Sequence, residues 1–187
     1  MMRIITGTAR GIKLATLEGD ATRPTSERAK EAVFSMIQFD IEGRNVLDLY
    51  AGSGQMGLEA LSRGAKNATF VDSSRAATDI IAANAKKTHL DASSRIITAD
   101  CNGFISRLNE KFDLVFIDPP YALHAVAGSL EGLLEKGALK STSTIVCESS
   151  EEDIFAMKPE LANKFNVLRR AKYGVAYITV LNPKGDL

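Results

Sequence analysis

The chain has 187 residues, of which 45% are hydrophobic, and its 23 Lys and Arg balance 23 Asp and Glu. This length suits one α/β domain with a good core and is too short for two domains of ordinary size. No overall basic charge indicates a nucleic-acid partner, and no run of about 18 apolar residues predicts a membrane span. Cys101 and Cys147 lack metal-type spacing, so we expect a cytoplasmic protein with free thiols and no metal site.

Positive charge is concentrated at the two ends of the chain. Residues 1–30 contain six Lys and Arg against three acids, and residues 158–187 contain six against two. Two basic ends around an acidic middle would be explained if both ends faced the same polyanion. Solvated side chains near the termini explain the same charges equally well, so both interpretations stay open at this point.

Residues 1–42 are expected to form a small extension that begins with a β-hairpin. Short β-like runs at 3–6 and 12–16 flank a glycine-containing turn, and the turn carries Arg10. Lys13 lies just beyond the turn. Both side chains could contact phosphates or could be ordinary surface charges of a hairpin.

A helix follows the hairpin. Thr25 comes directly after a proline and is the expected cap. Beyond it, apolar residues recur with the spacing of one inward helix face, at Ala29, Ala32, Val33, Met36 and Ile37. Arg28 falls off this stripe, where it is either solvated or placed near the cofactor or substrate.

From residue 43 onward, strand and helix patterns alternate, which predicts parallel βαβ units with right-handed crossovers. The last two strands, Phe165–Arg170 and Val175–Leu181, are too close in sequence for a crossover and must form an antiparallel hairpin. A parallel sheet finished by one reversed hairpin is typical of class I S-adenosylmethionine-dependent methyltransferases. We therefore expect that fold in one compact unit, 43–187. The expected strands before the hairpin are 45–50, 68–72, 95–99, 113–117 and 144–148, and the expected helices are 56–64, 75–88, 102–109 and 124–135.

The first strand of this unit runs directly into a glycine loop. Gly52 and Gly54 allow a tight turn in which backbone N–H groups approach a ligand closely. With Gly57 they match the dinucleotide spacing G-x-G-x-x-G, and Asp72 follows at the distance of a ribose-binding acid. NAD and S-adenosylmethionine both remain open as ligands. Asp48 is an acid inside a buried strand and needs a partner, which the positively charged methionyl end of S-adenosylmethionine, or water beside it, would supply.

Two further acids end strands at the sheet edge where ligands of parallel sheets bind. Asp72 could accept hydrogen bonds from both ribose hydroxyls, and Asp100 could meet an adenine amino group with Cys101 beside it. Helix capping is the structural alternative for both acids. The full set of expected cofactor-binding residues is Asp48, Tyr50, Gly52, Ser53, Gly54, Asp72, Ser73, Asp100, Cys101 and Thr25.

The most specific segment is an apolar strand that ends in Asp118, Pro119, Pro120 and Tyr121. Two prolines stiffen the backbone and remove two N–H donors, which leaves a site rich in acceptors. Such a site suits a substrate amino group, with the Asp118 carboxylate and the Pro119 carbonyl each accepting one hydrogen. Tyr121 could stack on the ring that carries the amine. We expect these four residues to be catalytic.

Five segments distributed along nearly the whole chain carry a family resemblance. They are Arg3-Ile-Ile-Thr-Gly with Arg10-Gly, Arg23-Pro-Thr-Ser-Glu-Arg28, Asp48-Leu-Tyr-Ala-Gly-Ser-Gly, Gly57-Leu-Glu-Ala-Leu-Ser-Arg-Gly-Ala and Asp118-Pro-Pro-Tyr. Together they resemble the bacterial 16S ribosomal RNA guanine-N2 methyltransferases, the RsmD family. The resemblance implies S-adenosylmethionine as methyl donor. It also implies one guanine of 16S rRNA as acceptor, in an assembled or partly assembled 30S subunit.

If the resemblance holds, we expect a monomer whose RNA contacts come from Arg3, Arg10, Lys13, Arg23 and Arg28. Three other functions remain. Methyltransferases of adenine N6 or of protein glutamine share the Asp-Pro-Pro-Tyr motif. A NAD-dependent oxidoreductase would use the same glycines but would leave that motif and the final hairpin unexplained. A non-catalytic ribosome assembly factor could keep the whole fold.

Overall fold

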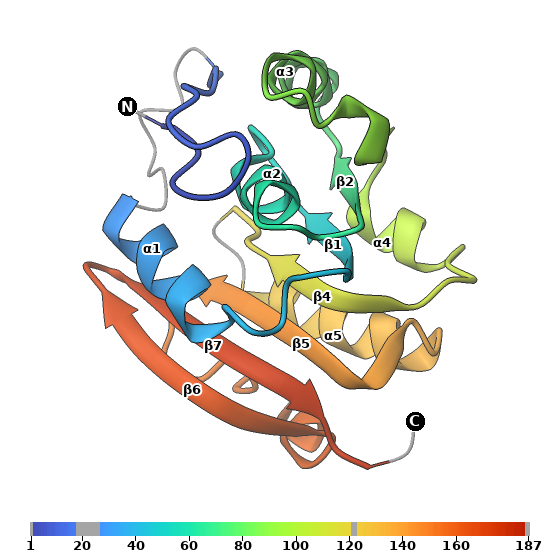
Figure 1. The fold of residues 1–187 in the computed structure, drawn as a ribbon. Helices are drawn as coiled ribbons and strands as arrows, with labels where there is room; N and C mark the ends of the chain where they lie inside the picture. The colour runs from blue at the N-terminus through green and yellow to red at the C-terminus, as the bar shows by residue number, and fades with distance from the viewer. Residues whose placement is uncertain (1, 18–26, 121–122, 186–187) are drawn as a thin grey trace.

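The computed structural model describes residues 2–17, 27–120 and 123–185. Within these ranges one seven-stranded sheet has the order β3-β2-β1-β4-β5-β7-β6 (Figure 1). The strands are β1 (Asn45–Leu49), β2 (Asn67–Asp72), β3 (Ser94–Thr98), β4 (Phe112–Ile117), β5 (Leu139–Ser149), β6 (Phe165–Tyr173) and β7 (Ala176–Pro183). The helices are α1 (Glu27–Met36), α2 (Gln55–Ser62), α3 (Arg75–Lys87), α4 (Cys101–Ile105) and α5 (Leu123–Glu135), with 3₁₀ turns η1 (Asp91–Ser93) and η2 (Pro159–Asn163).

The pairing of the strands confirms the predicted architecture. β1 pairs in parallel with β2 and β4, β3 with β2, and β5 with β4. β7 is antiparallel to both β5 and β6, so β6 and β7 form the predicted antiparallel hairpin at one edge of the sheet. Every residue of β4 is buried, as expected of a central strand covered on both faces.

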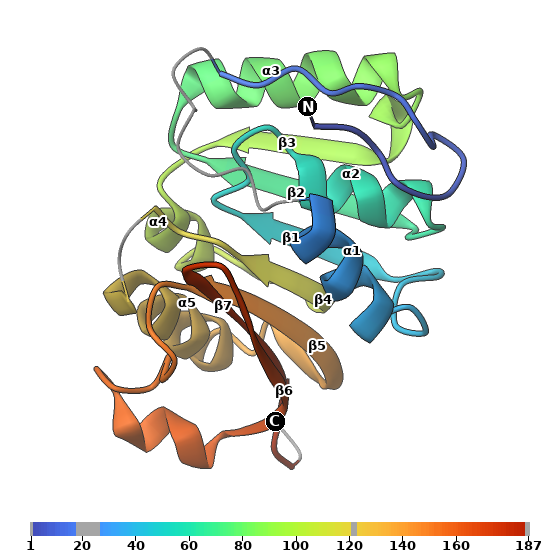
Figure 2. The same ribbon diagram turned by 90° about the vertical axis from the view of Figure 1, so that its left-hand side faces the viewer.

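Helices cover both faces of the sheet (Figure 2). One core cluster joins the sheet to α1, α2 and α3, and a second cluster joins it to α4 and α5. None of the helices in the described part of the chain is long and apolar enough to cross a membrane.

Element boundaries differ most from the prediction at two places. α4 ends at Ile105, earlier than the expected end of that helix, and β5 already begins at Leu139. β5 is longer because Leu139 pairs with Phe112 ahead of a register shift. Ser143 stabilises this irregularity by donating from Oγ to the Phe112 carbonyl at 2.6 Å.

The N-terminal segment is an antiparallel turn in which the only isolated bridge found in the described residues joins Arg3 to Lys13. The expected hairpin strands are therefore not regular strands. Ile4, Ala9 and Leu14 are buried in the same core cluster as α1 and α2. The turn lies against the C-terminal end of α2, where the Ser62 carbonyl accepts from the Thr8 N–H at 2.9 Å (Figure 2).

Gly7 provides a test of this docking. Its φ is +88°, and a Cβ there would lie 1.7 Å from the Ser62 carbonyl oxygen, whereas a Cβ at Gly11, with φ +82°, would meet nothing within 4 Å. Both Ala variants carry the cost of a positive φ, so the difference between them isolates the steric clash. We expect Gly7→Ala to lower the free energy of unfolding by about 1–3 kcal/mol more than Gly11→Ala in urea titrations. Equal losses would contradict the docking.

Candidate active site

The candidate site lies where the direction of strand order reverses, at the carboxyl ends of β1 and β4. β1 sits between β2 and β4, and this reversal point is where open α/β sheets bind ligands. Leu49 of β1 is the register partner of Ile117 of β4. The next residues, Tyr50 and Asp118, therefore leave the sheet at the same level, which brings the glycine loop beside the Asp-Pro-Pro segment.

The glycine loop has the backbone that the sequence predicted. Gly52 has φ +55° and Gly54 has φ +76°, and Gly54 is the N-terminal cap of α2. Tyr50 adopts a positive φ of 60° as well, which is uncommon for a residue with a side chain. A Cβ at Gly52 would meet no atom within 4 Å. The outer side of the loop is therefore open, as a ligand cradle requires.

Asp48 obtains a partner from within the protein. Its Oδ2 accepts from the Gly57 N–H at 2.8 Å, so the acid ties β1 to the first turn of α2. Only Gly fits at position 57, because a Cβ would lie 2.3 Å from the Phe70 ring. Burial raises the pKa of Asp48 to about 8, the Gly57 hydrogen bond opposes this rise, and the nearby Asp118 and Asp72 carboxylates add to it.

Asp72 joins the loops that follow β1 and β2. Its carboxylate accepts from the Gly52 N–H at 2.9 Å and from the Ser74 N–H at 2.8 Å. A carboxylate offers about four acceptor sites, so these two bonds leave acceptor capacity for a diol. Ser73, also expected to contact the cofactor, is exposed beside it. Ser53 turns toward the N-terminal segment, with its hydroxyl 3.0 Å from the Met2 sulfur.

Asp100 caps α4, which is the structural alternative considered from the sequence. Its Oδ2 accepts from the Gly103 N–H at 2.8 Å, and the residue stays exposed at the sheet edge. Cys101 is buried beneath it, and burial raises the pKa of its thiol to about 12. That thiol is therefore not a nucleophile near neutral pH. Tyr50 directs its hydroxyl to Ser129 at 3.2 Å.

Asp118 borders a small recess of about 20 Å³ on the α1 side of the sheet. Partial loss of hydration at the carboxyl group and the neighbouring Glu148 carboxylate raise the pKa of Asp118 to about 7, while the residue as a whole is exposed. A carboxyl group with a pKa near neutrality can both accept a hydrogen bond and take up a proton. Glu148 also lines the recess, and the rest of its lining is apolar, namely Val33, Met56, Phe116, Ile117, Val146 and Ile178.

Four of the five residues expected to bind RNA lie in the described part of the chain, three in the N-terminal segment and Arg28 in α1. Arg3 pairs with Glu27 at 2.9 Å, while Arg10, Lys13 and Arg28 are exposed. Arg10 lies in the turn beside the C-terminal end of α2, at the far end of that helix from the glycine loop. Three expected site residues lie outside the described residues, namely Arg23, Thr25 and Tyr121.

A buried ion pair that the sequence did not reveal fixes α1 beside the site. Lys30 Nζ lies 3.2 Å from Glu59 Oε2, and the two side chains are 1% and 0% exposed. Glu59 also accepts from the backbone N–H groups of Ile5 at 2.7 Å and Thr6 at 3.0 Å. The one available signal was the position of Lys30 next to the apolar stripe of α1.

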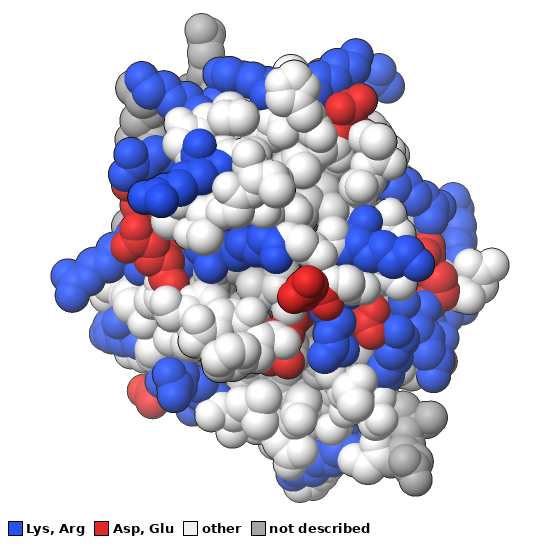
Figure 3. All heavy atoms as spheres, viewed as in Figure 1, with Lys and Arg blue, Asp and Glu red and all other residues white. Residues whose placement is uncertain are grey.

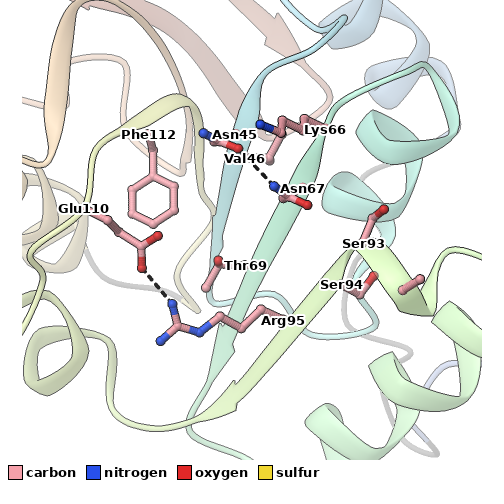
Figure 4. Close-up of a pocket in the computed structure, with 11 residues that line it drawn as sticks. Asn45, Val46, Lys66, Asn67, Thr69, Ser93, Ser94, Arg95, Glu110 and Phe112 are labelled. Carbon is pink, nitrogen blue, oxygen red and sulfur yellow. Dashed lines mark hydrogen bonds and ion pairs between the residues drawn. The ribbon is translucent and has the colours of Figure 1, made fainter.

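A larger hollow of about 360 Å³ lies at the opposite edge of the sheet, where β1, β2 and β3 begin (Figure 4). Its side chains pair with one another: Arg95 contacts Glu110 at 2.7 Å, and Asn67 donates to Asn45 at 3.3 Å. Parallel strands present their ligand site at their carboxyl ends. This hollow is therefore separate from the candidate site.

The raised pKa of Asp48 makes stability depend on pH. The folded protein keeps a proton on this carboxyl that the unfolded chain releases near pH 4, so the free energy of unfolding falls as pH rises toward about 8. Asp48→Asn retains an oxygen for the Gly57 N–H and removes this dependence. In urea titrations, the free energy of unfolding of the variant should rise relative to that of the wild type as pH increases from about 5 to about 8. Asp79→Asn, at an exposed position, is the control. If the unfolding free energy of Asp48→Asn followed pH in parallel with that of the wild type, the raised pKa of Asp48 would be contradicted.

Comparison with known proteins places the chain in a family. The family model described as Conserved hypothetical protein 95 matches residues 2–182. YlbH of Bacillus subtilis is 31% identical over 98% of this chain and 100% of its own length. Ribosomal RNA small subunit methyltransferase D of Haemophilus influenzae is 33% identical over 85% of this chain and 83% of its own length. The solved structure of yhhF from Escherichia coli superposes with a TM-score of 0.85 at 28% identity and 99% coverage of both chains. The fold is that of class I S-adenosylmethionine-dependent methyltransferases, and the chain belongs to the Conserved hypothetical protein 95 family, the family of YlbH and RsmD.

Proposed function

We propose that this protein is an S-adenosylmethionine-dependent rRNA methyltransferase that methylates the exocyclic N2 amine of one guanine in 16S rRNA. The acceptor would be the 30S subunit or a late assembly intermediate, in the cytoplasm, and the enzyme would act as a monomer. The observation that carries the proposal is the position of Asp118 directly beside the glycine loop, at the reversal point of the sheet. The relatives support the rRNA substrate, because the Haemophilus influenzae protein is named a small subunit methyltransferase.

The residues around the glycine loop fit S-adenosylmethionine. Gly52 leaves the loop surface open, Asp72 has acceptor capacity for ribose hydroxyls, and Asp100 is exposed at the adjoining strand end. Asp48 lies beneath the loop as a buried acid, and an adjacent positive charge would favour its ionised form. The bound cofactor supplies a methyl group on a positively charged sulfur.

The Asp-Pro-Pro segment would hold the amine that receives the methyl group. The Asp118 carboxylate and the Pro119 carbonyl each accept one hydrogen, which directs the nitrogen lone pair toward the methyl carbon. When bound, S-adenosylmethionine would supply the methyl group and its sulfur would keep the electron pair of the carbon–sulfur bond, and the Asp118 carboxylate would take up the proton that the acceptor nitrogen loses. A pKa of about 7 suits this role. Positioning the two reactants contributes most of the acceleration.

The N-terminal part, residues 1–42, would face the RNA, with residues 43–187 as the methyltransferase domain. Lys and Arg side chains are spread over the face that carries the N-terminal segment, with fewer acids among them (Figure 3). Arg3, Arg10, Lys13, Arg23 and Arg28 would hold the RNA backbone. The guanine must leave its stack to reach Asp118, at a cost of a few kcal/mol, and Tyr121 would stack on it.

Transfer of labelled methyl groups from S-adenosylmethionine tests the reaction. We expect 30S subunits that lack the modification to yield N2-methylguanosine after digestion. Asp118→Asn should reduce the rate at least about 100-fold, because removing a positioned proton acceptor has effects of this size, while calorimetric binding of S-adenosylhomocysteine stays within about twofold. Label in DNA, in protein or on adenine N6 would overturn the guanine assignment. Full turnover by Asp118→Asn would refute the role of Asp118.

Salt dependence tests the RNA-facing surface. Arg10→Ala combined with Lys13→Ala should flatten the slope of log affinity for 30S subunits against log salt by about one to two, because each lost phosphate contact removes about one. Lys111→Ala combined with Lys136→Ala is the matched control, since these exposed lysines lie outside residues 1–42, in the segments that precede β4 and β5. Equal slopes for the two double variants would contradict the assignment.

A further inference from the structure

Two carboxyl groups stand side by side where β4 and β5 reach the site. Phe116 of β4 and Val146 of β5 are register partners. Side chains two residues further along a strand point to the same face, and neighbouring strands lie about 4.8 Å apart. Asp118 and Glu148 therefore follow on the α1 face as neighbours, and both line the recess. The effect of Glu148 on the pKa of Asp118 is consistent with this closeness.

Apolar side chains surround these two carboxyl groups in the recess. α1 contributes Val33, α2 contributes Met56, and β7 contributes Ile178, the register partner of Glu148. With a volume of about 20 Å³, it has room for about one water-sized group. The edge of a planar base is thin enough to approach such a recess, and there it would meet two adjacent carboxyl groups.

Guanine is the base whose edge matches two adjacent carboxylates. Its N1–H and its N2 amine form a continuous row of donors, and an ionised carboxylate only accepts. In adenine and cytosine the amine lies next to a ring nitrogen that is itself an acceptor, so one carboxylate would face a lone pair. We propose that Glu148 is a specificity-determining residue whose carboxylate accepts from guanine N1–H while Asp118 holds the N2 amine. This inference rests on the proposed function and names how that site selects its base.

The two carboxylates would attract the donor edge of guanine and would repel the ring-nitrogen lone pair of the other amino-bearing bases. A hydrogen bond to a charged acceptor strengthens binding of the correct base, and an unpaired carboxylate facing a lone pair penalises the wrong one. Two carboxyl groups this close repel each other, in agreement with the effect of Glu148 on the pKa of Asp118. The donor row of the base offsets their mutual repulsion when it binds.

Base analogues in the acceptor test this role. The guanosine that becomes methylated is replaced by 2-aminopurine riboside through ligation of 16S RNA, followed by reconstitution of 30S subunits. This analogue keeps the N2 amine and presents a lone pair at N1. We expect wild-type protein to methylate it about 100-fold more slowly than guanine, a ratio typical of losing one buried charged hydrogen bond. Glu148→Gln, whose amide can donate to N1, should reduce this preference at least about tenfold.

The exposed Glu152→Gln is the matched control and should keep the wild-type ratio. An unchanged ratio in Glu148→Gln, or a wild-type enzyme that methylates both bases equally, would overturn the role of Glu148. The wild-type comparison needs no variant, so a variant that fails to fold leaves the inference testable. Absence of N2-methylguanosine in unmodified 30S subunits would instead refute the proposed function itself, so the two failures are distinct.

Discussion

The carboxylate of Glu59 is the contact on which the assembly of this site depends. It is fully buried on α2, where it pairs with Lys30 of α1 and accepts from the backbone of Ile5 and Thr6. Arg63 also pairs with this carboxylate, at 2.8 Å. Removing Glu59 would leave the buried Lys30 charge uncompensated, a loss that typically costs about 3–5 kcal/mol. α1 supplies Val33 to the recess and α2 begins at the glycine loop, so this one contact aligns the recess wall, the loop and the N-terminal segment.

The acids around the loop have different surroundings. Asp48 is buried and is held by the Gly57 N–H, so it fixes the start of α2. Asp72 joins two loops through two backbone N–H groups and keeps further acceptor sites. Asp118 stands at the solvent-facing end of β4 beside Glu148, and its pKa of about 7 places its titration near neutral pH. Under the proposed function, these surroundings suit Asp48 to a structural role, Asp72 to binding a ribose and Asp118 to the reaction.

The strands and the reversed hairpin could be predicted because their apolar periodicity is local, and the two glycines with positive φ were evident from their place after β1. Long-range partners could not be predicted. Lys30 and Glu59 look like solvated charges on two amphipathic helices, but in the fold they are buried against each other, and Lys30 also donates to the Arg3 carbonyl at 2.6 Å. The expected need of Asp48 for a partner was correct, but the partner is a backbone N–H nine residues later. Glu148 was missed because its significance arises from the register of β4 and β5.

The central claim is that the cofactor loop after β1 and the acceptor residues after β4 form one reaction site. A crystal structure of the protein with S-adenosylhomocysteine tests this claim most directly. The account predicts the ribose against Asp72, the loop at Gly52 and Gly54 around the ligand, and the sulfur directed toward Asp118. A ligand seated in the hollow at the opposite sheet edge, between Asn45 and Arg95, would contradict it.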